Sequence, residues 1–161
     1  MDFLFFGVSI QQSVHVAISL LAIVLGFWVM AAMIGSRRAP GATLAFLVLT
    51  LATTLSGFLL PLNGITPAVA TGFVSLVVLA AAFWARYGGR MRGRWRGVWV
   101  VSALVALWLN VFVLVTQLFL KAPALNALAP NGTEPPFLIA QVATLVLFVW
   151  AGVVAWRRFR P

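Results

Sequence analysis

The sequence contains, from Val98 to Leu120, the apolar stretch VWVVSALVALWLNVFVLVTQLFL, which has no Asp, Glu, Lys or Arg. A helix needs about 20 mostly apolar residues to cross a hydrocarbon core of about 30 Å. The stretch therefore predicts a membrane-spanning helix. It lacks the inside/outside alternation of transmembrane strands, which excludes a closed barrel.

Four further apolar stretches flank this one and predict more spans. We expect them at about residues 13–34, 42–60, 67–85 and 136–155. Together with 98–120 they predict an all-α fold, a single transmembrane domain built as a bundle of five helices. The composition agrees, because 63% of the 161 residues are apolar and only 8% are charged. Such a composition excludes a soluble domain.

The connections between spans contain residues typical of turns and helix starts. Thr66 before Pro67 predicts an N-cap followed by a first-turn proline, so residues 61–66 are expected to form a tight turn in a helical hairpin. Thr133 and Glu134, followed by two prolines, predict a similar start for the last span.

Only Asp2 is charged before Arg37. A secretory signal peptide needs a basic start, so we expect the N-terminal segment to stay on the mature protein.

The charges predict how the bundle sits in the membrane. The chain has 11 basic and 2 acidic residues, a formal net charge of +9. Ten of the 11 basic residues follow the first span, the third span or the fifth span, and with five spans these positions share one side. The positive-inside rule makes that side the cytoplasm. The N-terminus is then outside and the C-terminus cytoplasmic.

The segment RYGGRMRGRWRG, from Arg86 to Gly97, is the most distinctive polar stretch. Its four glycines disfavour a helix and predict a flexible cytoplasmic loop. The positive charge of this segment is explained if it only sets the orientation of the bundle in the membrane. The alternative is that the arginines also contact anionic lipid. The residues concerned are Arg86, Arg90, Arg92, Arg94 and Arg96. No nucleic-acid-binding module accompanies the arginines, so nucleic acid is not an expected partner.

Polar residues near the outer ends of spans are candidates for a binding site. Gln11, His15, Gln117 and Gln141 would form an outward-facing pocket if the first, fourth and fifth spans are neighbours. Such a pocket suits a quinone or a lipid headgroup, and haem only if His15 of two subunits shares the iron, because the chain has one histidine. The alternative is ordinary hydrogen bonding between helices.

Deeper residues predict packing contacts. Asn110 lies near the middle of its span, and we expect its amide to join two helices. We expect Trp28, Trp108 and Trp150 to pack within the bundle. Small residues four positions apart would let helices approach closely. These pairs are Ser13 with Ala17, Ala22 with Gly26, and Ala151 with Ala155.

The inventory of reactive side chains argues against an enzyme. The chain has no cysteine, one histidine and two acids, and no charge lies inside a predicted span. Thiolate chemistry, zinc sites of the HExxH type and paired intramembrane aspartates are therefore excluded. We predict no metal site. A proton-coupled transporter is disfavoured for the same reason.

The stretch KAPALNALAPNGTEPPF, from Lys121 to Phe137, precedes an apolar span and the terminal RRFRP. This pattern resembles a group of small multi-pass inner-membrane proteins of proteobacteria. The resemblance implies a bacterial inner membrane, and it brings no activity, cofactor or binding residue.

Three functions remain open from the sequence. The first is a non-catalytic accessory or assembly subunit that packs against a larger membrane complex or against itself. The second is a binding or redox-linked protein with quinone, lipid or haem in the outer pocket. The third is a small passive channel or exporter, for which Asn110 is the one mid-membrane polar candidate.

Overall fold

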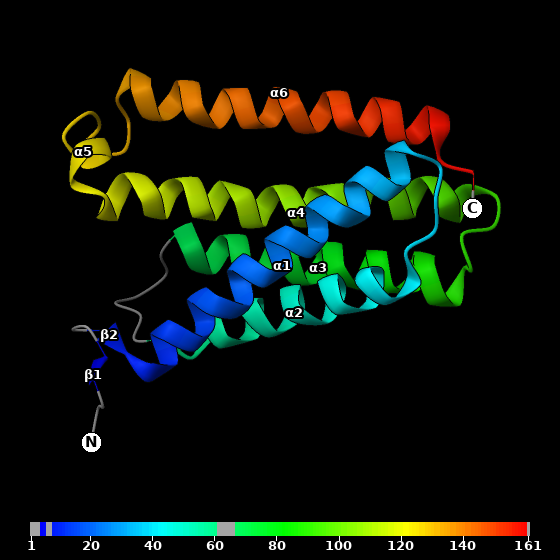
Figure 1. The fold of residues 1–161 in the computed structure, drawn as a ribbon, viewed down its shortest axis with the longest axis horizontal. Helices are drawn as coiled ribbons and strands as arrows, with labels where there is room; N and C mark the ends of the chain where they lie inside the picture. The colour runs from blue at the N-terminus through cyan, green and yellow to red at the C-terminus, as the bar shows by residue number, and fades with distance from the viewer. Residues whose placement is uncertain (1–3, 6–7, 61–66, 161) are drawn as a thin grey trace.

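The computed structural model describes residues 4–5, 8–60 and 67–160 (Figure 1). Five of its helices are long and apolar enough to cross a membrane, the third together with the π-helix that continues it. The prediction of an all-α bundle with five spans is confirmed. The elements in chain order are β1 (Leu4–Phe5), β2 (Val8–Ser9), α1 (Ile10–Ile34), α2 (Pro40–Phe58), α3 (Pro67–Phe83), η1 (Trp84–Gly88), α4 (Arg94–Lys121), α5 (Pro123–Asn126) and α6 (Pro135–Arg158).

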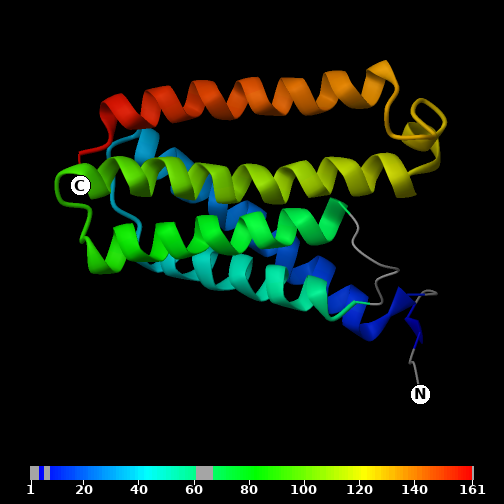
Figure 2. The same cartoon turned by 180° about the vertical axis from the view of Figure 1, so that it is seen from behind.

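Helix α4 is the centre of the bundle. Figures 1 and 2 show α6, α4, α3 and α2 side by side, with α1 crossing one face of this layer diagonally. Helix α4 contributes eleven buried residues, whereas α6 contributes three. The span that carries the longest apolar stretch is thus packed by protein on most sides, and α6 is peripheral.

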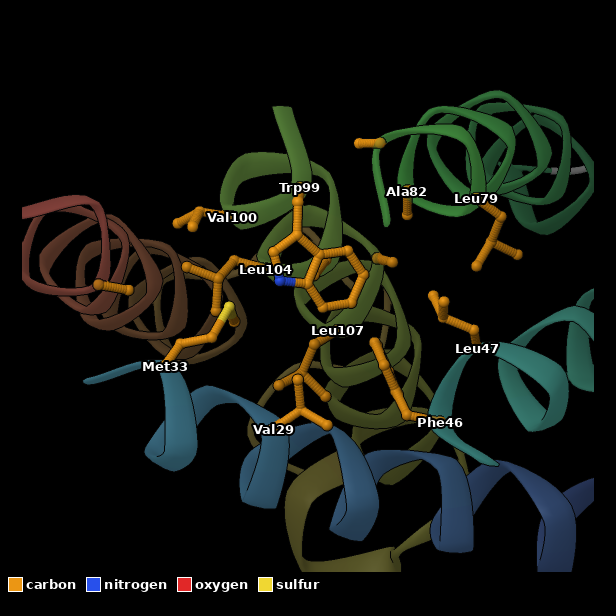
Figure 3. Close-up of a cluster of buried hydrophobic side chains, with 14 of the residues drawn as sticks. Val29, Met33, Phe46, Leu47, Leu79, Ala82, Trp99, Val100, Leu104 and Leu107 are labelled. Atoms are coloured by element: carbon orange, nitrogen blue, oxygen red, sulfur yellow. The ribbon is translucent and has the colours of Figure 1, made fainter. Parts of the chain in front are cut away.

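The core lies where α4 meets α1, α2 and α3. Trp99 is 2% exposed and lies in the middle of this cluster. Figure 3 shows it among side chains from all four helices: Val29 and Met33 of α1, Phe46 and Leu47 of α2, Leu79 and Ala82 of α3, and Val100, Leu104 and Leu107 of α4.

Small residues bring α1 close to its neighbours. Ala22 and Gly26 are both buried, and a Cβ built at Gly26 would overlap Leu107 of α4. Glycine is therefore required at this crossing. The pair Ala151 and Ala155 of α6 is likewise buried, whereas Ser13 and Ala17 are exposed and lie outside any close contact between helices.

The arginine-rich segment is not the flexible loop predicted from its glycines. The π-helix η1 covers its start, and α4 already begins at Arg94. Two of the four glycines allow close packing, since a Cβ at Gly97 would overlap the Trp156 ring and one at Gly89 would overlap Trp95. Inside α4, the contact with Trp156 offsets the low helix propensity of Gly97, which costs only about 1 kcal/mol.

The deep tryptophans differ from the prediction. Trp108 is half-buried and packs against the core. Trp28 of α1 and Trp150 of α6 instead face outwards, with 64% and 59% of their surface exposed. Each lies on the side of its helix that no other part of the described chain covers.

Most helices extend beyond the predicted spans by a few residues, whereas α2 ends at Phe58, two residues before the predicted end. Helices continue past the apolar stretch into charged flanks, as at Arg94 and Arg158. Glu134, not Thr133, is the N-cap of α6. The apolar N-terminal lead-in contains the short antiparallel β1–β2 pair. The turn predicted at 61–66, with its proposed cap Thr66, lies outside the described residues.

The three basic segments meet at one end of the bundle. The Arg160 amide donates a hydrogen bond to the Ser36 hydroxyl at 3.1 Å, joining the C-terminal segment to the α1–α2 connection. Arg96 of α4 bonds to the carbonyl oxygen of Phe159 at 2.8 Å. We call this end the basic end and the other the opposite end.

Candidate functional site

Two of the four residues predicted to share a pocket are bonded to α2. Gln11 Nε2 donates a hydrogen bond to the Leu59 carbonyl oxygen at 3.0 Å. His15 Nδ1 and the Ser56 hydroxyl oxygen are hydrogen-bonded at 2.7 Å. Both bonds fasten the start of α1 to the end of α2, and they occupy one polar atom of each side chain.

The other two residues lie on α4 and α6. Gln141 Nε2 donates to the Phe112 carbonyl oxygen and to the Thr116 hydroxyl, both at 3.2 Å. Gln117 is half-buried and follows Thr116 on α4. Gln141 Oε1 is buried and has no hydrogen-bond partner among the described residues. Three of the four predicted residues are thus hydrogen-bonded in two separate groups, Gln11 and His15 to the end of α2 and Gln141 to α4.

Hydroxyl groups of α2 form interhelical bonds; Asn110 was expected to join two helices, but the hydroxyl partners were not identified from the sequence. Asn110 Nδ2 of α4 donates to Thr50 Oγ1 at 3.2 Å. The Thr54 and Ser75 hydroxyls are 3.2 Å apart and join α2 to α3. The repeated threonines of α2 were the available signal, because buried hydroxyls in membrane bundles bond across helices. The mid-membrane amide Asn110 joins two helices.

An open basin lies at the basic end. Its lining residues are Arg38, Arg86, Tyr87, Arg90, Met91 and Arg92, and its volume is about 580 Å³. We call it the arginine basin. Arg38 comes from the α1–α2 connection, and the other residues come from η1 and the turn that follows it. Two segments that are distant in sequence therefore supply guanidinium groups to one hollow.

A left-handed turn positions the basin's arginines. Arg90 and Met91 have φ values of 47° and 56°, a region that most residues avoid. The Met91 amide donates to the Ala85 carbonyl oxygen at 2.9 Å, which folds the turn back onto η1. The Met91 side chain is buried at 7% exposure, while Arg90 and Arg92 on either side of it are exposed.

Arg86 is held in place by aromatic rings and a thioether. Its guanidinium carbon lies 5.7 Å from the Tyr87 ring centre and 6.0 Å from that of Trp99. Its Nη1 lies 3.7 Å from the Met91 sulfur. These contacts restrain the side chain while leaving its strong donors available, because a ring face and a thioether are weak acceptors.

The floor of the basin is closed by the core. A second, much smaller cavity of about 10 Å³ shares Arg38, Arg86 and Met91 with the basin and is bounded below by Met33 and Trp99. That space holds about one water molecule. The basin is therefore a surface hollow with an apolar floor, and no acyl chain fits beneath it.

Two of the five arginines predicted to contact lipid do not line the basin. The Arg94 guanidinium lies 5.2 Å from the Trp95 ring centre. Arg96 Nη1 donates to the carbonyl oxygens of Trp156 and Phe159, both at 2.8 Å, and so caps the end of α6. Arg38, which the sequence analysis did not place with this group, belongs to the basin.

The arginine basin has no acidic neighbour among the described residues. Their one acid, Glu134, lies at the opposite end, where it accepts hydrogen bonds from the Asn131 and Thr133 amides, both at 3.0 Å. Partial desolvation raises the pKa of the Glu134 carboxyl, but these bonds outweigh it and hold the pKa below its usual value. The negative charge of Glu134 is thus stabilised by hydrogen bonds from its own loop.

The two ends of the bundle therefore offer different chemistry. The opposite end presents amides and an imidazole that are largely bonded to neighbouring helices. The basic end presents clustered guanidinium donors in an open hollow.

Comparisons of the chain with protein-family models, curated proteins and solved structures found no match.

Proposed function

We propose that this chain is a non-catalytic accessory or assembly subunit of a bacterial inner membrane, and that it packs laterally against a larger membrane complex or a second copy of itself. One observation carries the proposal: Trp28 and Trp150 expose most of their indole surface in the interior of their spans. Indole groups of membrane proteins favour the headgroup level, where the N–H meets water or lipid oxygens.

The depth of the two indoles supports a protein partner. Trp28 lies six residues before the end of α1 at Ile34, and Trp150 lies five residues before Ala155, the end of its predicted span, which is ~9 Å and ~8 Å along the helix axis. At that depth the indole N–H lacks a hydrogen-bond partner in lipid. A neighbouring protein surface supplies both a partner and aromatic contact area.

The two indoles lie close to a contact between their helices. The Phe27 and Phe148 rings, whose centres are 6.1 Å apart, join α1 to α6. Trp28 directly follows Phe27, and Trp150 lies two residues after Phe148. A partner that packs on α1 would cover Trp28, and one that packs on α6 would cover Trp150. Helix α6 has only three buried residues, so most of its surface is available for such packing.

Photo-crosslinking in native membranes tests the lateral partner. A photoreactive side chain at Trp28 or Trp150 is expected to give a protein adduct of defined mass. Val77 of α3 is the matched control, because it is 72% exposed on another helix, and it should give lipid adducts alone. Lipid adducts alone at all three positions would contradict the proposal. Mass spectrometry of the adduct separates a second copy of this chain from another subunit.

We place the basic end in the cytoplasm and the N-terminus outside, because positive charge is retained on the cytoplasmic side. Reporter fusions should show this orientation. Fusions at Gly89 and at the C-terminus are expected to report a cytoplasmic location, and fusions at Asn63 and Asn126 the outside. An external signal at Gly89 would reverse the topology.

A further inference from the structure

We propose that the arginine basin is a binding site for a ligand with two or more phosphate charges. Its four guanidinium groups, from Arg38, Arg86, Arg90 and Arg92, line one open hollow of about 580 Å³. Guanidinium groups bind phosphate oxygens through paired, charge-assisted hydrogen bonds. This site is independent of the lateral surface around Trp28 and Trp150.

Charge balance favours a polyanion. Four like charges in one hollow repel each other unless a counter-charge is bound. The basin has no carboxylate side chain within the described part of the chain, since Glu134 lies at the opposite end. A ligand with one negative charge would leave most of this repulsion in place. A ligand with two neighbouring phosphate groups neutralises more of the charge of the four arginines than a ligand with one negative charge.

The basin is already formed without a ligand. The aromatic and thioether contacts of Arg86 restrain its side chain. The left-handed backbone at Arg90 and Met91 turns the chain so that Met91 is buried while Arg90 and Arg92 reach the basin. The Arg86 guanidinium is therefore ordered before a ligand binds, and prior ordering raises affinity. Backbone conformations of this kind cluster at ligand sites.

The depth of the basin matches the phosphate layer of a membrane. Trp84 is 61% exposed and stacks edge-on with Trp95 at a ring distance of 6.5 Å, beside the turn that carries the arginines. Exposed indoles near span ends lie at the headgroup level. The space of about 10 Å³ beneath the basin admits no acyl chain, so the chains of a bound lipid would lie along the outside of the bundle.

Lipid and soluble phosphate share this chemistry, and two probes separate them. The first is cardiolipin, a lipid with two phosphates, titrated into the full-length protein in mild detergent and measured by native mass spectrometry against phosphatidylcholine. The second is inorganic pyrophosphate, added as a competitor and titrated alone by calorimetry. Displacement of cardiolipin by pyrophosphate supports a site open to soluble phosphates as well. Cardiolipin binding without displacement supports a lipid site.

Single-charge variants distinguish the basin from the general positive charge. Arg86→Gln and Arg38→Gln are each expected to weaken phosphate binding about five- to tenfold. Arg94→Gln and Arg157→Gln remove the same charge from the same end but do not line the basin, and they should weaken it less than twofold. The exposed Arg38 provides a basin variant whose folding does not depend on core contacts.

Two results would overturn the proposal. Equal weakening by all four variants would mean that binding follows net charge and not the basin. Binding of neither cardiolipin nor pyrophosphate by the wild-type protein would remove the site altogether. An unchanged thermal midpoint for Arg38→Gln shows that its loss of binding is not a loss of fold.

Discussion

Replacing Gly26 with valine is expected to lower the free energy of unfolding by about 3 kcal/mol, because α1 crosses the bundle at this glycine without space for a side chain. A Cβ there would overlap Leu107 of α4 and lie 2.9 Å from Phe46 Cε2 of α2. Leu107 and Phe46 are each 1% exposed, so neither can rotate away. The crossing would have to open, and contacts to both helices would be lost.

Unfolding of the purified protein in mixed micelles, followed as sodium dodecyl sulfate is added, measures this effect. Gly41→Ala is the matched control, because a Cβ at Gly41 meets nothing within 4 Å. That control should be neutral or slightly stabilising, since alanine has the higher helix propensity. If Gly26→Val unfolds at the same detergent fraction as the wild type, the tight crossing of α1 is wrong.

The sequence was sufficient to predict the spans but not their arrangement. Uncharged apolar stretches mark membrane helices because lipid excludes charge, and this signal lies within each helix. Which helices touch depends on shape. Ala22–Gly26 and Ser13–Ala17 have the same spacing, yet only the first pair is buried. Spacing alone cannot say which small residues meet a partner.

The same distinction applies to the arginines. Their density predicted a basic surface, and three of the five named residues line the arginine basin. Arg38 was missed because its connection lies far away in sequence, and only the folded bundle brings it beside Arg86. Arg96 does not line the basin, because its guanidinium binds the end of α6. The residue type predicted a cluster of guanidinium groups. The tertiary contacts decide which arginines line the basin.

Replacing Trp99 with alanine is expected to lower the free energy of unfolding by about 3–5 kcal/mol, the largest effect that we expect from a single substitution. The indole is 2% exposed and lies where α4 meets α1, α2 and α3 (Figure 3). Its removal would leave a cavity among side chains that are already closely packed. Protein packing, more than the hydrophobic effect, holds membrane helices together, so the lost contacts bear directly on stability.

Trp150→Ala separates this effect from the loss of any tryptophan. That indole is 59% exposed, so its removal should change the unfolding of the isolated protein by less than about 1 kcal/mol. Trp99→Phe should be intermediate in stability, and it retains a ring beneath the Arg86 guanidinium. Equal unfolding of Trp99→Ala and Trp150→Ala in the detergent titration would contradict the central position of α4. Because the Trp99 ring contacts the Arg86 guanidinium of the arginine basin, its loss should weaken cardiolipin binding as well, while Trp150→Ala should leave that binding unchanged.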